Sequence, residues 1–267
     1  MEIERYAELT KKLEVSDIDW NSGAQAGLSP DEVFTLTYFS DIEHQPVHYM
    51  RDLLNTRSEQ ADEDALAFLG IWNYEEYFHG TALAKLLKIC GHDLGKNRIA
   101  QVRGKASPTE WLMAQGSTLI SKMFDSAFVT LFMTWGATNE VSTHNGYLRL
   151  RELTDNPVLK ELCIRIAKQE RMHFSWYYNN AKKRLEANPF HQKFVRFMMT
   201  RFWSPVGAGV KTDDEVARLF TYLFSGQAGV DLAQEVDSKI EALPGLAGMK
   251  LTRKYLDGLT QKGLVAV

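Results

Sequence analysis

Two pairs of residues in this chain share the spacing Glu-x-x-His: Glu76 with His79, and Glu170 with His173. Residues three apart lie on the same face of an α-helix, so each pair can present a carboxylate and an imidazole to one point. These groups are donors that bind iron and manganese. A single pair is more often a contact on a helix surface, whereas two pairs in one chain predict a metal site.

A single glutamate precedes each pair on the apolar stripe of an earlier helical segment. Glu43 precedes the first pair and Glu140 the second, so the chain contains a two-fold internal repeat. Such a repeat is typical of a four-helix bundle that holds two metal ions. Carboxylates buried on an apolar stripe also need a neutralising partner. We therefore predict two iron ions, with manganese as the alternative metal and two carboxylates bridging; the predicted ligands are Glu43, Glu76, His79, Glu140, Glu170 and His173.

Two further residues are candidate catalytic groups because each lies one helical turn from a predicted ligand. Trp72 precedes Glu76, where an indole can relay an electron or orient a ligand, and where it can equally well pack in the core. Thr143 follows Glu140, which places its hydroxyl near the metals. The alternative for Thr143 is a hydrogen bond back to the carbonyl of Asn139.

Three histidines and one more glutamate are close to the predicted ligands in sequence. His44, His48 and His144 are alternative ligands, although contacts behind the ligands or with solvent fit them better. Glu75 is adjacent to Glu76 and points about 100° away around the helix. We expect its carboxylate on the helix surface or behind the ligands.

The hydrophobic pattern predicts helices along the chain and no alternating run typical of a strand. Capping boxes begin helices at Ser29, Ser107 and Thr212, and Pro46 is expected to kink the first long helix beside Glu43. The Asn- and Gly-containing stretch 17–28 is predicted to be a loop. The predicted helices span 1–14, 29–54, 61–90, 107–122, 124–153, 156–187, 190–202, 212–225, 230–242 and 250–259. We expect an all-α protein with a single domain over 1–267. It should consist of an additional N-terminal helix, a four-helix core (29–187) and a C-terminal helical extension (188–267).

The charge balance and the cysteine content bear on which kinds of partner the protein binds and in which compartment it works. The chain has 31 Lys and Arg against 34 Asp and Glu, a net charge of −3, which argues against nucleic acid and membrane surfaces as partners. Its first residues lack the pattern of a signal peptide, and no apolar run approaches the ~18 residues of a spanning helix. Cys90 and Cys163 form no CxxC motif. We expect a cytoplasmic protein, or one of the plastid stroma if this is the mature form of an organellar protein.

The segments around the predicted ligands resemble the soluble acyl-acyl-carrier-protein desaturases, a family of ferritin-like di-iron proteins. The segment 72–80 is similar to the family's W-x-x-E-E-x-x-H-G motif. The resemblance extends over about 29–183, slightly more than half of the chain. It also rests on Glu43-His44-Gln45-Pro46, Glu140-x-x-Thr143, His144-x-Gly146-Tyr147 and Glu170-Arg171-Met172-His173. The chain departs from the family in being shorter than the plant members, in the region after Asn188, and at Gln169, where an acidic residue is usual.

This resemblance implies an O2-dependent di-iron enzyme with a ferritin-like fold. It implies a homodimer that receives electrons from a ferredoxin-type donor and introduces a cis double bond into an acyl chain on acyl carrier protein. The six predicted ligands would then bind iron, and Thr143 would match a hydroxyl near the oxygen-binding face. An acidic carrier protein needs a basic docking patch, for which the candidates are Lys182, Lys183, Arg184, Lys193, Arg196 and Arg201. Each of these is also explained as a solvated cation near a helix end.

Two other functions remain open at this point. The same six ligands serve a di-iron hydroxylase or N-oxygenase that acts on another substrate, which a carrier can hold. A ferritin-like protein that handles iron, or one without metal that binds partners, is the alternative from a different class. The length of the C-terminal extension and the Glu-x-x-Thr pattern at Glu140 argue mildly against iron storage.

Overall fold

The computed structural model describes residues 2–46, 50, 53–54, 56–60, 62–103 and 119–264. Within these ranges the chain is helical and contains no strand, so the predicted all-α class is confirmed. None of the helices in the described part is long and apolar enough to cross a membrane. The helices are α1 (Ile3–Leu9), α2 (Trp20–Ala26), α3 (Pro30–Glu43), α5 (Arg57–Gln60), α6 (Glu63–Ile89), α7 (Arg98–Arg103), α9 (Asp125–Leu153), α10 (Pro157–Ala187), α11 (Pro189–Phe202), α12 (Asp213–Leu223), α13 (Gly226–Glu241) and α14 (Leu251–Gln261).

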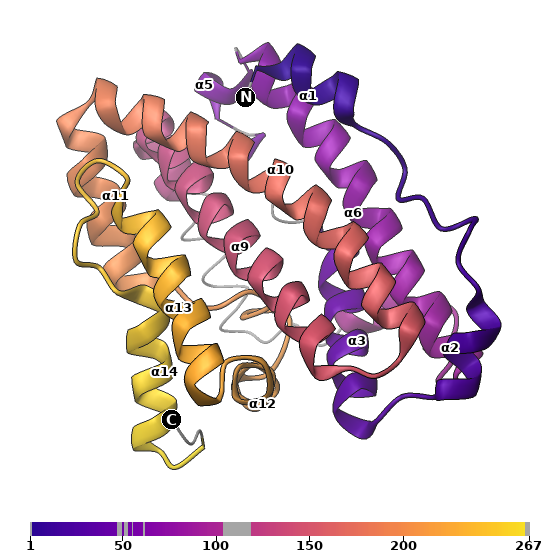
Figure 1. Ribbon diagram of the computed structural model, residues 1–267. Coiled ribbons are helices and arrows are strands. Elements are labelled where there is room, and N and C mark those ends of the chain that lie inside the picture. The colour runs from indigo at the N-terminus through magenta and orange to yellow at the C-terminus, as the bar shows by residue number, and fades with distance from the viewer. Residues whose placement is uncertain are drawn as a thin grey trace.

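Four helices carry the predicted ligands, and they pack as two pairs. α3 packs against α6, and α9 packs against α10 along much of its length. α10 also contacts α6, which joins the two pairs, and it lies between α6 and α9 in Figure 1. The two pairs correspond to the two halves of the predicted repeat, so the lone glutamate of each half comes from a helix packed against its Glu-x-x-His helix.

The caps of these helices follow the sequence signals. The Ser29 side chain accepts from the Glu32 backbone N–H, and the Glu32 carboxylate accepts from the Ser29 N–H, which completes the predicted capping box. Asn156 caps α10 by accepting from two backbone N–H groups, and Asn188 caps α11. Gly91, with φ of 90°, follows the end of α6, as expected for a helix stop.

The helix predicted over 29–54 is interrupted beside Pro46 instead of kinked within a continuous helix: α3 ends at Glu43, and the backbone is helical again at Pro46 and Met50. Pro46 has no N–H to donate to the Ile42 carbonyl. The backbone N–H of Gln45 donates to that carbonyl at 2.8 Å and closes a tighter turn. Glu43 is therefore the last residue of its helix.

The prediction of a loop over 17–28 is also wrong, because α2 forms there. Asp19 caps this helix by accepting from the Asn21 N–H, and α2 packs against both α6 and α10. At Gly23 a Cβ atom would overlap Val158 of α10, so the glycine permits a close approach of the two helices. The first helix is shorter than the predicted 1–14, and the predicted 107–122 helix falls mostly outside the described residues.

The C-terminal helices cover the opposite side of α9 from α6. α11, α12 and α13 each contact α9, while α14 packs against α12 and α13 (Figure 1). Buried side chains of α13, including Val236 and Ile240, belong to the same apolar cluster as Phe68, Val129 and Trp176 of the ligand-bearing helices. The extension thus shares an apolar core with α6, α9 and α10.

Candidate metal centre

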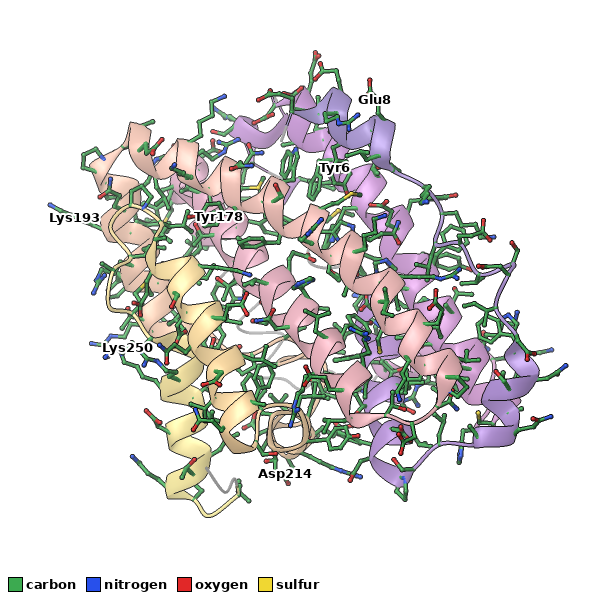
Figure 2. The ribbon with its side chains drawn as sticks, in the orientation of Figure 1. Tyr6, Glu8, Tyr178, Lys193, Asp214 and Lys250 are labelled. Carbon is green, nitrogen blue, oxygen red and sulfur yellow. The ribbon has the colours of Figure 1, made fainter. Side chains whose placement is uncertain are left out.

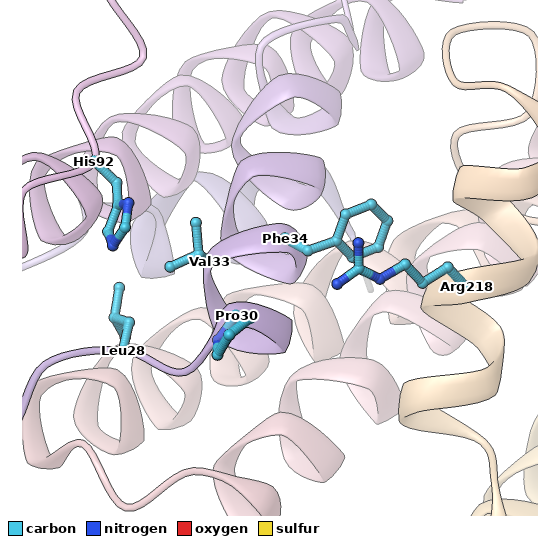
Figure 3. A pocket seen from close by; sticks show the side chains of 6 residues that line it. All are labelled: Leu28, Pro30, Val33, Phe34, His92 and Arg218. Carbon is cyan, nitrogen blue, oxygen red and sulfur yellow. The ribbon is translucent and has the colours of Figure 1, made fainter.

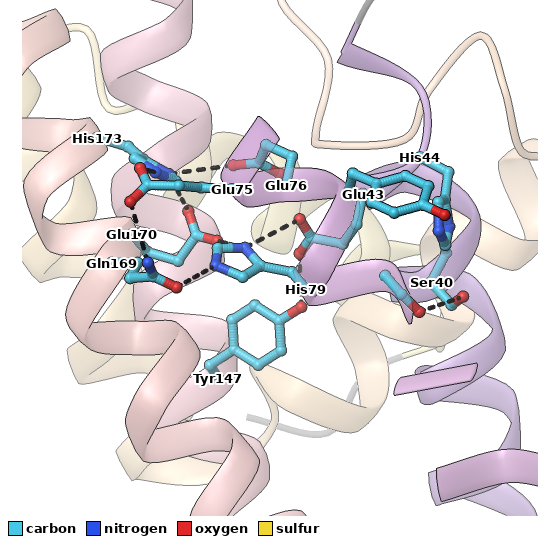
Figure 4. Close-up of polar contacts among 12 residues, drawn as sticks. Ser40, Glu43, His44, Glu75, Glu76, His79, Tyr147, Gln169, Glu170 and His173 are labelled. Atoms are coloured by element: carbon cyan, nitrogen blue, oxygen red, sulfur yellow. Dashed lines mark hydrogen bonds and ion pairs between the residues drawn. The ribbon is translucent and has the colours of Figure 1, made fainter. Parts of the chain in front are cut away.

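The six predicted ligands meet in the interior of the protein. Glu43 comes from the last residue of α3, Glu140 from α9, and one Glu-x-x-His pair from each of α6 and α10. Each of the six side chains is at most 6% exposed. Figure 4 shows five of them pointing toward one another from three helices.

The donor atoms of these side chains form two overlapping groups that can hold metal. In the first group, ligand atoms of Glu43, His79, Glu76 and Glu170 lie within 4.8 Å of one another. In the second, ligand atoms of Glu140, His173, Glu76 and Glu170 do so. Glu76 and Glu170 belong to both groups. Both carboxylates therefore contribute a donor atom to each group.

Several donor atoms in the cluster have no hydrogen bond. They are buried, and buried polar atoms are nearly always paired. The Nδ1 atom of His79 is 3.0 Å from Glu170 Oε1 and 3.5 Å from Glu43 Oε2, but without hydrogen-bond alignment. Glu76 Oε1 is a further such atom. Unpaired oxygens and nitrogens that converge on one volume fit divalent metal ions.

The charges in the cluster depend strongly on one another. Burial acts to lower the pKa of His79, but the neighbouring carboxylates of Glu170 and Glu43 outweigh it and raise that pKa to about 10. The pKa of His173 is also raised, against the effect of burial. Burial and then the charge of Glu170 raise the pKa of Glu140 well above its usual value. Without metal, protons on the cluster therefore reduce the repulsion among its carboxylates.

Glu170 has the opposite shift because it lies between both imidazoles. Burial acts to raise its pKa, but His173 and His79 outweigh this and hold the pKa below its usual value. For Glu76, burial and the charges of Glu43 and Glu170 raise the pKa well above the usual value. The pKa values of the two carboxylates that both donor groups share are thus shifted in opposite directions.

A second layer of residues holds the imidazoles from behind. His173 Nε2 lies 3.0 Å from Glu75 Oε2, and His79 Nε2 lies 3.0 Å from Gln169 Oε1. Glu75 is fully buried, so its expected place behind the ligands is confirmed and a place on the helix surface is wrong. Tyr6 points from α1 toward this layer (Figure 2) and donates to Glu75 at 2.6 Å.

Two tyrosines were not identified as site residues from the sequence. Tyr147 lies on the same stripe as Glu140, and its hydroxyl donates to Glu43 Oε1 at 2.5 Å. Its spacing of two turns from Glu140 is a usable signal, but an aromatic residue on such a stripe is more often core. Tyr6 is far from every ligand in sequence, so no spacing rule identifies it.

The neighbouring histidines have other contacts. His44 donates from Nδ1 to the Ser40 carbonyl at 2.6 Å and packs against Gly80 of α6. The His144 ring nitrogen Nδ1 is 2.8 Å from the Ala167 carbonyl. Neither belongs to the donor groups, which agrees with roles other than ligands. His48 lies outside the described residues.

Trp72 lies in α6 and Thr143 in α9, each about one helical turn from a predicted ligand. Trp72 is buried, one turn before Glu76, and its ring lies edge-on to Tyr177 with centroids 5.6 Å apart. It therefore packs in the core, while its role in electron relay stays a prediction. Thr143 is partly buried on α9, one turn after Glu140. Its part in chemistry is likewise a prediction.

The surface carries two further features that bear on ligands. A hollow of about 460 Å³ lies at the beginning of α3, the opposite end from Glu43, and is lined by Leu28, Pro30, Val33, Phe34, His92 and Arg218 (Figure 3). In the basic set, Arg184 pairs with Asp62, and Arg196 donates to two backbone carbonyls. Lys193 extends outward from α11 (Figure 2) and Arg201 is exposed on the same helix.

No family model matches this chain, and no curated protein was found to be similar to it.

Proposed function

We propose that this protein is an O2-dependent di-iron oxidase that acts on a fatty acyl chain. The observation that carries the proposal is the pair of buried donor groups that share Glu76 and Glu170. Two carboxylates common to both groups, with one imidazole and one further carboxylate specific to each, suit two adjacent iron ions within a ferritin-like four-helix bundle. Manganese is the alternative metal.

The protein supplies position, charge and a dry surrounding to this centre. Glu43, Glu76, His79, Glu140, Glu170 and His173 would hold the ions, and reduced iron bound there supplies the O2 activation that no side chain provides. Tyr147 holds Glu43 by a hydrogen bond, and Glu75 and Gln169 hold the two imidazoles. The burial of all six ligands excludes bulk water. In this proposal Thr143 faces the oxygen-binding side and Trp72 relays electrons.

The proposed substrate is an acyl chain carried by acyl carrier protein, and the proposed product contains a cis double bond. Support comes from the motif at 72–80 and from the exposed cations of α11, which suit an acidic carrier. Exposed Phe197 and Phe202 lie on the same helix and add apolar contact area. We further propose a homodimer and a ferredoxin-type electron donor.

Mass spectrometry of acyl-carrier-protein products tests the reaction. The iron-loaded protein is incubated with acyl carrier protein bearing a saturated chain, a reduced ferredoxin-type donor and O2. Loss of two hydrogens from the acyl chain supports a desaturase. Gain of one oxygen would instead identify a hydroxylase or N-oxygenase, and an unchanged substrate with a large, iron-filled shell would identify an iron-handling protein. A Glu76→Ala variant is the control for metal-dependent turnover.

A further inference from the structure

The two donor groups are unequal on the side that faces away from the cluster. Behind His173 lies the carboxylate of Glu75, which is fully buried and 3.0 Å from His173 Nε2. Behind His79 lies the neutral amide of Gln169, at the same distance. Figure 4 shows Glu75 and Gln169 next to each other, joined by a dashed line. One imidazole thus has an anionic partner and the other does not.

The contacts of Gln169 fix the direction of these hydrogen bonds. Its Nε2 atom lies 2.8 Å from the Lys11 carbonyl and 3.0 Å from Glu75 Oε1, and both are acceptors. The amide nitrogen therefore donates to both, so Oε1 must accept from the Nε2–H of His79. His173 Nε2–H donates to Glu75 in the same way. Both rings then turn Nδ1 toward the cluster. The Nε2–H of His173 donates to a carboxylate, whereas the Nε2–H of His79 donates to a neutral amide.

Tyr147 adds a second, independent inequality. Its hydroxyl donates to Glu43, the carboxylate that belongs only to the first group. This bond draws negative charge away from a metal bound by Glu43. Among the described residues no hydroxyl donates to Glu140, the equivalent carboxylate of the second group. Its neighbour there is His173 Nδ1 at 3.5 Å.

The neutral partner of His79 and the hydrogen bond of Tyr147 to Glu43 should both lower metal affinity at the first donor group. Building on the di-metal centre proposed above, we propose that the two donor groups bind metal with unequal affinity. The second group, which contains Glu140 and His173, should fill before the first, which contains Glu43 and His79. A carboxylate behind an imidazole makes that imidazole a stronger donor. The position of Glu43 and His79 has a neutral amide behind its imidazole and a hydrogen bond that competes for its carboxylate.

Titration with Mn²⁺, followed by electron paramagnetic resonance, tests the order of filling in the full-length protein. The first equivalent should give the spectrum of an isolated ion, and a spin-coupled pair should develop only with the second. His79→Ala should retain the tighter ion, and His173→Ala should lose it. The inference is overturned if the coupled spectrum develops from the first additions, or if His79→Ala removes the tighter ion.

Substitution of Glu75 tests the cause with an almost isosteric change. Glu75→Gln should weaken the first Mn²⁺ ion by ~10–100-fold, the usual effect of losing an outer hydrogen-bond partner. Glu32→Gln is the matched control, since Glu32 is another buried glutamate, placed at the beginning of α3 outside both donor groups. Equal first-ion affinities in these two variants would contradict the inference, even if the histidine variants do not fold. Failure of the folded wild-type protein to bind any Mn²⁺ would overturn the proposed function as well, whereas two ions of equal affinity would overturn only this inference.

Discussion

Glu170 is the side chain on which the cluster depends most. It belongs to both donor groups and lies close to both imidazoles, with Oε1 3.0 Å from His79 Nδ1 and Oε2 3.4 Å from His173 Nδ1. Glu43, by contrast, belongs to one group. A bridging carboxylate and a terminal one should therefore have different effects when removed.

We expect Glu170→Ala to abolish binding of both ions and Glu43→Ala to leave one. The reason is that removal of Glu43 takes a donor from one position and leaves the other with all four, while removal of Glu170 takes a donor from both positions. Metal content per chain, measured after reconstitution and desalting, checks this. Far-ultraviolet circular dichroism confirms that both variants are helical. Equal metal contents in the two variants would argue against a bridging role.

Metal affinity should rise with pH. Without metal, His79 has a pKa raised to about 10, so it is protonated at neutral pH and must release a proton to bind a metal. Raising the pH lowers the competition from protons, and the apparent affinity should increase about tenfold per pH unit for each proton released. Calorimetric titration in buffers with different ionisation enthalpies measures the number of protons. An affinity that falls or stays constant between about pH 6 and about pH 8 would be inconsistent with this charge assignment.

At the scale of helices, the positions of the predicted ligands could be derived from the sequence, and among the residues that support them only Glu75 was expected there. Spacing by three residues places Glu76 and His79 on one face wherever the helix lies, and capping residues mark most helix ends. The end of α3 at Glu43 could not be predicted, because a proline permits either a kink or a stop and packing decides between them. α2 depends on close contact with α10, which a pattern rich in Gly and Asn does not reveal. Tyr6 reaches the site only because α1 packs against α6.

The packing of α3 on α6 depends on Gly80. A Cβ atom there would overlap the ring of His44, which is held by its hydrogen bond to the Ser40 carbonyl. Gly80→Ala should therefore destabilise the protein by ~1–3 kcal/mol, as expected for overpacking. Gly70→Ala on the same helix meets no atom within 4 Å and should instead stabilise it by ~0.5–1 kcal/mol. Urea unfolding of the two variants measures both values, and two equal free energies would contradict this packing.

The exposed cations of α11 are the part of that helix that should meet a carrier protein. Reversing two of them, Lys193→Glu with Arg201→Glu, should raise KM for acyl carrier protein by roughly tenfold or more and leave metal content unchanged. Lys254→Glu with Lys262→Glu is the control, because these lysines lie on and just after α14. Steady-state kinetics at low salt compares the two. An unchanged KM in the α11 variant would place the docking surface elsewhere.

At the scale of the whole molecule, two helix pairs meet around a buried cluster of charge. α3 with α6 and α9 with α10 each bring one lone glutamate and one Glu-x-x-His pair, and the C-terminal helices pack on the outer side of α9. Four carboxylates in such an interior require compensation, which protons give in the metal-free state and metal ions would give in the loaded state. The two halves contribute the same types of predicted ligand, but the residues behind their imidazoles differ: Glu75 behind His173 and Gln169 behind His79.

Mössbauer spectroscopy of the protein reconstituted with iron-57 under anaerobic conditions, with metal content measured on the same sample, tests the di-metal centre most directly. We predict two iron ions per chain that become a spin-coupled diferric pair after exposure to O2, and the loss of both in Glu170→Ala. A folded wild-type protein that binds no iron, or whose iron stays as isolated ions and persists in Glu170→Ala, would contradict the account.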